Sequence, residues 1–136
     1  MASKDLKRLI AYSSVSHMGF VLLGMASATQ EGVAGAVYQM VSHGVITTML
    51  CLIAGVLYDR TSDRMIENYS GLARIMPAYF AVVLIAFFAS LGLPGFSGFI
   101  AEIMVFLGAF RSEVIHLSLA VIATLGLALG AAYYLW

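Results

Sequence analysis

Charged residues are scarce in this chain. Lys, Arg, Asp and Glu make up 10% of its 136 residues and hydrophobic residues make up 62%, whereas a soluble domain usually carries about 25% charged residues. The seven basic and seven acidic residues cancel, so no overall charge marks a nucleic-acid partner or an acidic substrate. The composition predicts a membrane protein that contacts the lipid bilayer and binds no nucleic acid.

Cysteine is nearly absent as well. Cys51 is the one cysteine and lies in an apolar run, so the chain cannot form an intrachain disulfide or a cysteine-rich zinc site. The three histidines are not spaced as a helical pair, and no second carboxylate accompanies them in the apolar segments. We therefore expect no metal site.

Long apolar stretches divide the chain. They predict an all-α, polytopic fold of about four membrane segments in a single membrane domain, roughly residues 7 to 28, 33 to 58, 76 to 110 and 115 to 136. The third stretch is too long for one ordinary crossing, and its middle holds Leu93, Pro94 and Gly95. Because Pro94 removes a backbone donor and glycine relaxes the backbone, we expect a discontinuous helix, broken near residues 93 to 95. A proline kink without function is the alternative.

Basic residues are unevenly distributed between the loops. Only Arg111 lies in a loop on one side. The other six flank the first span or lie between the second and third spans: Lys4, Lys7, Arg8, Arg60, Arg64 and Arg74. The positive-inside rule then puts both termini on the cytoplasmic side, or on the matrix side in an organelle. Lys7 fits either a topology anchor or the inner mouth of a hydrated path.

One acidic residue lies inside an apolar stretch. Glu102 has no basic residue within eight positions on either side. An ionised carboxylate near mid-bilayer costs about 3 kcal/mol, so Glu102 should face a cavity, pair with a cation or bind a proton. We interpret it as a proton-binding group, and the alternative is a static carboxyl that fixes helix register.

Two histidines in the first two spans have polar neighbours. On the second span a stripe of small and polar residues recurs every four positions and should face protein or water. Imidazole exchanges protons with water near neutral pH, so His17 and His43 are candidate relay groups, with helix packing as the alternative. The residues expected to line their path are Ser13, Ser16, Gln39 and Thr47.

Three stretches resemble one membrane family. They read DLKRLIAYSSVSHMGF from residue 5, QMVSHG from residue 39 and GLPGFSGFIAE from residue 92. In this order they resemble the antiporter-like membrane subunits of respiratory complex I. The broken helix of the second repeat usually carries a lysine in this family but a glutamate in the M-type chains, so Glu102 is similar to the M type.

The resemblance implies a part of one inverted repeat of the antiporter-like fold, in which buried charged residues carry protons. His17 and His43 match positions in the family's central polar axis. Lys7 matches a lysine at the start of the helix that carries His17. The implied activity is proton translocation within NADH:quinone oxidoreductase, in a bacterial or organellar inner membrane. NADH, FMN, iron–sulfur clusters and quinone would belong to partner subunits, with no cofactor or redox centre on this chain.

The resemblance also implies partners. These are other membrane subunits of complex I or the remaining part of its own chain. Two other functions stay open from the sequence. One is a subunit of a multisubunit sodium/proton antiporter, which shares the fold, and the other is a structural or assembly fragment that moves no ions.

Overall fold

The structure is a computed structural model and describes residues 5–62, 65–66 and 71–135. In these residues the chain is helical apart from turns and an isolated β-bridge, which confirms the predicted all-α class. The helices are α1 (Leu6–Ala26), α2 (Gln30–Thr61), α3 (Leu72–Ile75), α4 (Pro77–Ser90), α5 (Ser97–Arg111) and α6 (Leu117–Leu135).

Local sequence sets where these helices begin and end. The side chain of Asp5 accepts a hydrogen bond from Lys7 N at the start of α1, and that of Thr29 accepts one from Gly32 N at the start of α2. Both satisfy amides that lack a partner within the first helical turn. Pro77 occupies the first position of α4, where its missing amide hydrogen costs nothing.

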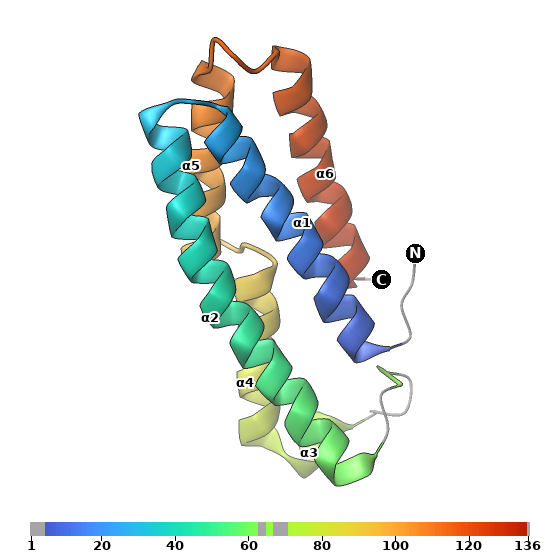
Figure 1. The fold of residues 1–136 in the computed structure, drawn as a ribbon. Coiled ribbons are helices and arrows are strands. Elements are labelled where there is room, and N and C mark those ends of the chain that lie inside the picture. Colours follow the sequence, from blue (N-terminus) through green and yellow to red (C-terminus); the bar gives the residue numbers. More distant parts are fainter. Residues whose placement is uncertain (1–4, 63–64, 67–70, 136) are drawn as a thin grey trace.

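The long helices form an antiparallel bundle (Figure 1). α1 and α2 run side by side in opposite directions, and α4 and α5 follow one another along α2. α2 packs against α1, α4 and α5, whereas α6 contacts α1 and α5. α2 is therefore the central element of the bundle.

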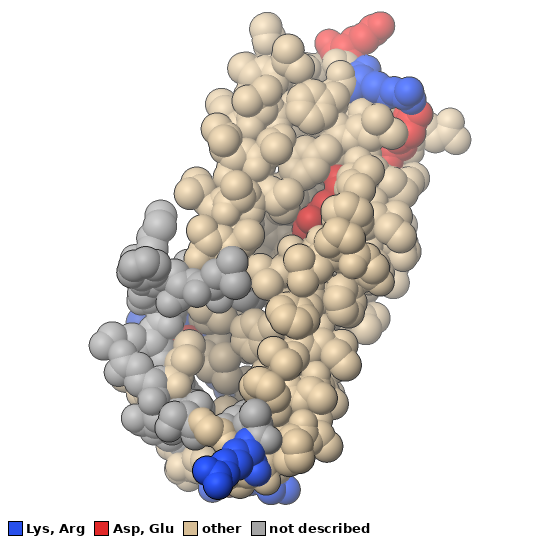
Figure 2. All heavy atoms as spheres, turned by 180° about the vertical axis from the view of Figure 1, so that it is seen from behind, with Lys and Arg blue, Asp and Glu red and all other residues tan. Residues whose placement is uncertain are grey.

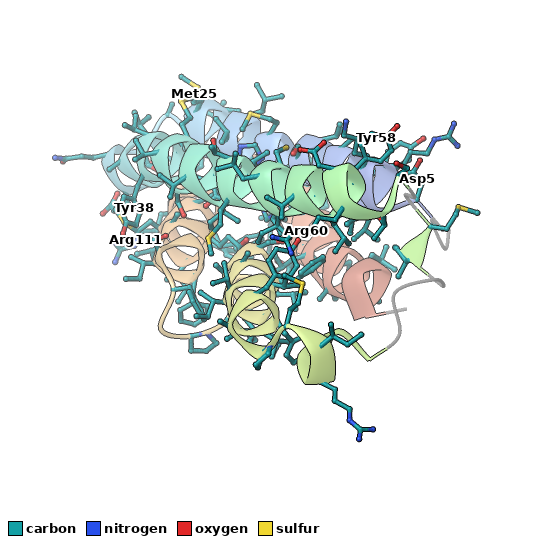
Figure 3. The ribbon with its side chains drawn as sticks, turned by 90° about the horizontal axis from the view of Figure 1, so that it is seen from below. Asp5, Met25, Tyr38, Tyr58, Arg60 and Arg111 are labelled. Atoms are coloured by element: carbon teal, nitrogen blue, oxygen red, sulfur yellow. The ribbon has the colours of Figure 1, made fainter. Side chains whose placement is uncertain are left out.

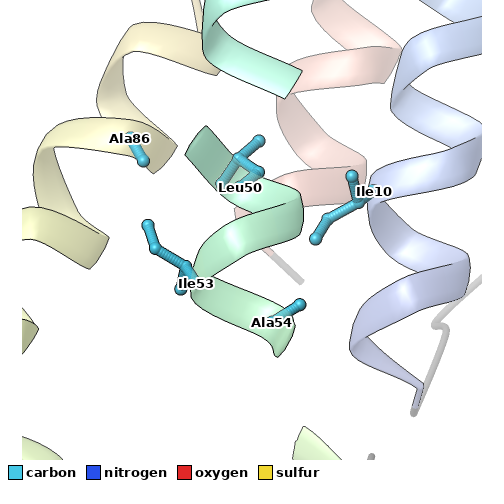
Figure 4. Packing of buried hydrophobic residues seen from close by; sticks show 5 residues of the cluster. All are labelled: Ile10, Leu50, Ile53, Ala54 and Ala86. Carbon is cyan, nitrogen blue, oxygen red and sulfur yellow. The ribbon is translucent and has the colours of Figure 1, made fainter. Parts of the chain in front are cut away.

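An apolar cluster joins α1, α2 and α4. Its buried members are Ile10, Leu50, Ile53, Ala54 and Ala86 (Figure 4). Close packing of these aliphatic side chains stabilises the contact through many small dispersion interactions. The cluster fixes α4 on the C-terminal half of α2.

Glycines bring α1, α2 and α5 together at the opposite end. A Cβ added to Gly24 would lie 2.7 Å from Gly32 O, and one added to Gly35 would lie 2.8 Å from Val105 N. A Cβ on Gly108 would meet the backbone of Gly32. Only glycine permits backbones to approach this closely, so we name Gly24, Gly32, Gly35 and Gly108 the glycine contact.

Apolar side chains cover much of the outer surface. α1 and α2 are long and apolar enough to cross a membrane, and α4 and residues 117–132 of α6 form shorter apolar helices. Figure 2 shows acidic and basic groups mainly near the ends of one face, and Figure 3 shows Met25 pointing outward from the bundle. The number of crossings stays a prediction.

A non-helical segment separates α4 from α5 in the region where the sequence predicts a broken helix. α4 ends at Ser90 and α5 begins at Ser97, so the non-helical segment is somewhat longer than residues 93 to 95. Gly92 and Gly95 have φ angles of +66° and +107°, which glycine adopts without strain. That α4 and α5 form one discontinuous crossing stays a prediction.

Charged residues mark two ends of the bundle. At the Asp5 end, an isolated β-bridge joins Asp5 to Met65, which follows α2. At the Arg111 end, Arg111 Nη1 donates to Glu31 Oε1 over 3.0 Å. Figure 3 shows Asp5 and Arg111 at opposite ends. Lys4 and Arg64 lie outside the described residues, and which end faces the cytoplasm stays a prediction.

Candidate functional site

Glu102 lies on the buried face of α5. That face consists of small residues and one acid: Gly98, Ala101, Glu102, Val105, Gly108 and Ala109. Because these residues recur at three- and four-residue spacing, they form one stripe toward α1 and α2. Glu102 is only 4% exposed, so its carboxyl group lies inside the bundle.

His17 of α1 faces this carboxyl group. Its Nδ1 lies 3.8 Å from Glu102 Oε1 and 3.3 Å from Gln39 Nε2 on α2. Three helices therefore each contribute one polar side chain to the same point. With the amide oriented this way, Gln39 donates to Nδ1, and the hydrogen of a neutral His17 ring lies on Nε2.

His43 lies next to this group. Its Nε2 is 3.0 Å from Thr47 Oγ1, one turn further along α2. The ring centroids of His43 and His17 are 5.6 Å apart. A space of about 10 Å³ is lined by both histidines, Gln39 and Thr47, and such a volume is about the size that holds one water molecule.

Three buried polar atoms have no hydrogen-bond partner among the described residues: Gln39 Oε1, Ser90 Oγ and Glu102 Oε1. Buried polar groups without a partner cost about 1 to 3 kcal/mol each. Their presence in one place is typical of functional sites and of positions where water binds. The site keeps spare hydrogen-bonding capacity.

A larger cavity of about 420 Å³ borders Glu102. It lies between α1, the end of α4 and α6, and its walls are mainly apolar. The polar residues that line it are Tyr12, Ser13, Ser16, His17, Ser90 and Glu102. Since Ser13, His17 and Ser90 also line the small space, the two spaces share a wall.

The segment between α4 and α5 touches the carboxyl group through Gly92. A Cβ added to Gly92 would lie 2.5 Å from Glu102 Oε2. Leu93, Pro94 and Gly95, which the sequence singled out, are themselves exposed. The break therefore brings a bare backbone against the acid while its proline lies on the outside.

The structure brings most predicted site residues together. Gln39 and Ser13 are buried beside His17, and Ser16 lies at the large cavity. Lys7 is the exception, because it is exposed at the Asp5 end and lines a separate groove with Arg8 and Thr47. That groove has a volume of about 550 Å³.

Three contributors were not singled out from the sequence. Ser90 ends α4 and lines both spaces, and Ser42 Oγ is 2.7 Å from Ser97 Oγ, which ties α2 to the start of α5. Gly92 was part of the glycine-rich break but had no assigned contact. In the sequence, Ser42 stands next to His43 and Ser90 precedes the glycine-rich segment. These positions were the signals that could have identified the two serines.

In the described ranges, no group of three His, Cys, Asp or Glu side chains could hold a metal ion. The site consists of one carboxyl group, two imidazoles, an amide and several hydroxyls, all of which exchange protons or bind water. The expectation that the chain carries no metal stays a prediction.

Comparison with known proteins agrees with the resemblance seen in the three stretches. Residues 1–127 match the family model described as NADH:quinone oxidoreductase/Mrp antiporter, transmembrane. The chain is 48% identical over 136 residues to NADH-quinone oxidoreductase subunit M of Rhodobacter capsulatus, covering 100% of this chain and 26% of that protein.

Two relatives from other lineages are equally similar. NADH-ubiquinone oxidoreductase chain 4 of Chondrus crispus is 48% identical over 132 residues, covering 97% of this chain and 26% of that protein. NAD(P)H-quinone oxidoreductase chain 4 1 of Nostoc sp. is 48% identical over 129 residues, covering 95% and 24%. The chain spans about a quarter of the length of these relatives, and it belongs to the NADH:quinone oxidoreductase/Mrp antiporter transmembrane family.

Proposed function

We propose that this chain is the proton-relaying part of a membrane subunit of NADH:quinone oxidoreductase. One observation carries the proposal: the buried Glu102 carboxyl group faces His17 at 3.8 Å and has an oxygen without a hydrogen-bond partner among the described residues. The names of the M-type and chain 4 relatives support the complex to which it would belong.

His17 and Glu102 form the last pair of the relay. Starting from a neutral His17 ring with its hydrogen on Nδ1 beside a Glu102 carboxylate, the ring takes a proton on Nε2 from the space shared with His43 and gives the Nδ1 proton to the carboxylate. Glu102 then releases that proton into the large cavity, and return of the ring hydrogen from Nε2 to Nδ1 resets the pair. Over the whole cycle one proton enters the site and one proton leaves it.

Gln39 assists both states of His17. Its amide nitrogen lies 3.3 Å from Nδ1 and would donate to Nδ1 when that nitrogen carries no hydrogen. Rotation of the amide by half a turn would present Oε1, which accepts from a protonated Nδ1. Because Oε1 has no other partner in the described ranges, the rotation breaks no competing hydrogen bond.

The low dielectric constant inside the bundle would let charges in neighbouring subunits control the relay. Two charges interact far more strongly there than in water. A charge that moves in a neighbouring subunit would therefore change which of the two states of Glu102 and His17 is more stable. We propose this electrostatic coupling as the link to electron transfer.

Electron transfer itself would take place on partner subunits. We place NADH, FMN, the iron–sulfur clusters and quinone there, and no redox centre on this chain, on the strength of the resemblance. The chain would cross a bacterial or organellar inner membrane four times, with α4 and α5 as one discontinuous crossing and both termini on the cytoplasmic or matrix side. Six of the seven basic residues support that orientation.

Two other functions fit parts of the same observations. The family description also names an antiporter, so a sodium/proton exchanger would use the same site with a sodium gradient as energy source. A structural subunit would use the buried polar residues only for helix packing. Sodium-driven proton uptake in proteoliposomes would favour the first, and normal pumping without Glu102 would favour the second.

The decisive experiment replaces Glu102 in the full-length subunit of the assembled complex. We expect Glu102→Gln to assemble normally and to lower NADH-driven proton pumping in inverted membrane vesicles by about tenfold or more, because the amide cannot release a proton. Glu102→Asp should keep part of the activity. Glu113→Gln, on an exposed acid near the Arg111 end, is the matched control.

The outcome separates the alternatives. Loss of pumping with normal assembly supports the relay. Loss of assembly in Glu102→Gln, with normal pumping per assembled complex, would overturn the relay and support a structural role.

A further inference from the structure

We propose that the groove at the Asp5 end is the water-filled access path to the relay, and that the hydroxyl group of Thr47 is its inner gate. The inference rests on the proposed proton relay and adds where protons reach it. It concerns residues of α1 and α2 that touch neither Glu102 nor His17 directly.

The groove carries polar groups along a wall that also includes three apolar residues, Ile10, Ala11 and Ala54. It has a volume of about 550 Å³ and lies between the first half of α1 and the second half of α2. Asp5, Lys7 and Arg8 lie at its outer end, and Ser14, Thr47 and Cys51 line it further in. Charged groups at the mouth and hydroxyls inside favour water over lipid chains.

Thr47 borders two separate spaces. It lines the groove and also the small space that His17 and His43 line. Among the described residues that line these two spaces, it is the one that they share. Its hydroxyl lies 3.0 Å from His43 Nε2, so a group that can both donate and accept a proton stands between the groove and the first histidine.

The spaces continue in series beyond this point. The small space meets the large cavity beside Glu102 at a wall formed by Ser13, His17 and Ser90. A path therefore runs from the Asp5 end through Thr47, His43 and His17 to Glu102. It uses no residue of the exposed turn formed by Pro94 and Gly95.

The proton balance at the gate is simple. The Thr47 hydroxyl gives its hydrogen to Nε2 of His43 and takes another from a water in the groove, which becomes hydroxide or is itself reprotonated from bulk water. Thr47 is unchanged at the end, and His43 carries one extra proton. His43 then releases a proton from its other ring nitrogen into the small space toward His17.

Substitutions at Thr47 test the gate in the assembled complex. Valine has nearly the shape of threonine but cannot relay a proton, so we expect Thr47→Val to lower pumping by about tenfold, with normal assembly. Thr47→Ser keeps the hydroxyl and should restore most of the rate. Thr48→Val is the control, because Thr48 is exposed and bonds only to the Gly44 carbonyl among the interactions that the structure describes.

The native cysteine tests whether water fills the groove. Cys51 is exposed and lines it. A charged methanethiosulfonate reagent that does not cross membranes should modify Cys51 from the side that the Asp5 end faces and not from the other side. The same treatment of Cys51→Ser identifies labelling at other cysteines of the complex.

Each result decides one point. Pumping by Thr47→Val at the rate of Thr48→Val would overturn the gate, and so would a Cys51 that the charged reagent reaches from neither side or only from the opposite side. If Glu102→Gln still abolishes pumping in either case, the relay stands and only this access path fails. If Glu102→Gln also pumps normally, the relay itself is wrong.

Discussion

The interface between α2 and α5 contains two regions that differ in how much room they leave. At the glycine contact, helix backbones approach so closely that an added Cβ at Gly108 or Gly35 would meet another backbone. Around Glu102, only a turn or two away, buried oxygens lack partners in the described part of the chain, the large cavity borders the acid, and the small space shares His17 with that cavity.

The glycine contact stabilises the bundle, whereas the region around Glu102 retains unsatisfied polar groups. Small residues that allow close backbone packing stabilise helix association in membranes, where no hydrophobic driving force acts between helices. A polar site with spare hydrogen-bonding capacity is instead destabilising. We infer that the glycine contact holds the three helices firmly enough for Glu102, His17 and Gln39 to stay under-satisfied between them.

The glycine contact should be the more sensitive region for stability. Valine at Gly108 would collide with the backbone of Gly32, and backbone cannot yield as a flexible side chain does. We expect Gly108→Val to cost about 3 kcal/mol or more and to lower the amount of assembled complex in membranes severely, as measured by native gel electrophoresis.

A glycine on the same helix pair provides the control. Gly44 has no atom within 4 Å of an added Cβ, so Gly44→Ala should assemble normally. Normal assembly of Gly108→Val would mean that α2 and α5 are not held by this contact.

Gly92 shares a feature with each region. Its backbone packs closely, as at the glycine contact, and the group that it packs against is the Glu102 carboxyl group. Alanine there would be strained by the φ angle of +66° and would crowd Glu102 Oε2. The left-handed conformation costs about 1 to 2 kcal/mol for a residue with a Cβ. We expect Gly92→Ala to reduce assembly mildly and pumping per assembled complex strongly.

Gly95 provides the comparison for this variant. It also has a positive φ angle, of +107°, but an added Cβ would meet nothing within 4 Å. Gly95→Ala should therefore show backbone strain without displacing the carboxyl group. Equal pumping by the two variants would show that contact with Glu102 does not matter.

The sequence predicted the parts of this picture that depend on periodicity and on helix breakers. The four-residue stripe on the second span placed Gln39, His43 and Thr47 on one face, and they do line one space. Pro94 and its glycines marked the place where the helix is interrupted, although the non-helical segment spans residues 91 to 96. These features are local, so the chain itself encodes them.

Features that depend on how helices face each other were not predictable. Nothing local indicates that Gly92 rather than Gly95 touches Glu102, since that depends on the direction in which the turn leaves α4. The role of Ser90 in both spaces follows in the same way from the packing of α1 and α6 around the end of α4. Lys7 was paired with the relay residues by resemblance, and the structure places it at the groove instead.

Replacement of Gln39 tests the region around Glu102. We expect Gln39→Leu to leave stability within about 1 kcal/mol, because removal of an amide oxygen without a described partner offsets the lost contact with His17. Pumping should fall about tenfold, since the His17 ring loses the group that fixes its hydrogen position. Thermal stability and pumping of the complex measure the two effects separately, and Met40→Leu on the exposed side is the control. A large loss of stability with normal pumping per complex would show that Gln39 serves helix packing and not the proton relay.

The ion pair at the Arg111 end should contribute least to stability and to pumping. Arg111 and Glu31 form an ion pair at 3.0 Å, but their side chains are 63% and 42% exposed. Exposed pairs contribute about 0 to 1 kcal/mol and are screened by salt. In a double-mutant cycle of Arg111→Met and Glu31→Gln, we expect a coupling energy below about 1 kcal/mol in the thermal unfolding of the complex. The coupling should shrink further at high salt, and pumping should stay normal. A coupling as large as the effect of Gly108→Val would show that charge pairing, rather than backbone contact, holds α2 against α5.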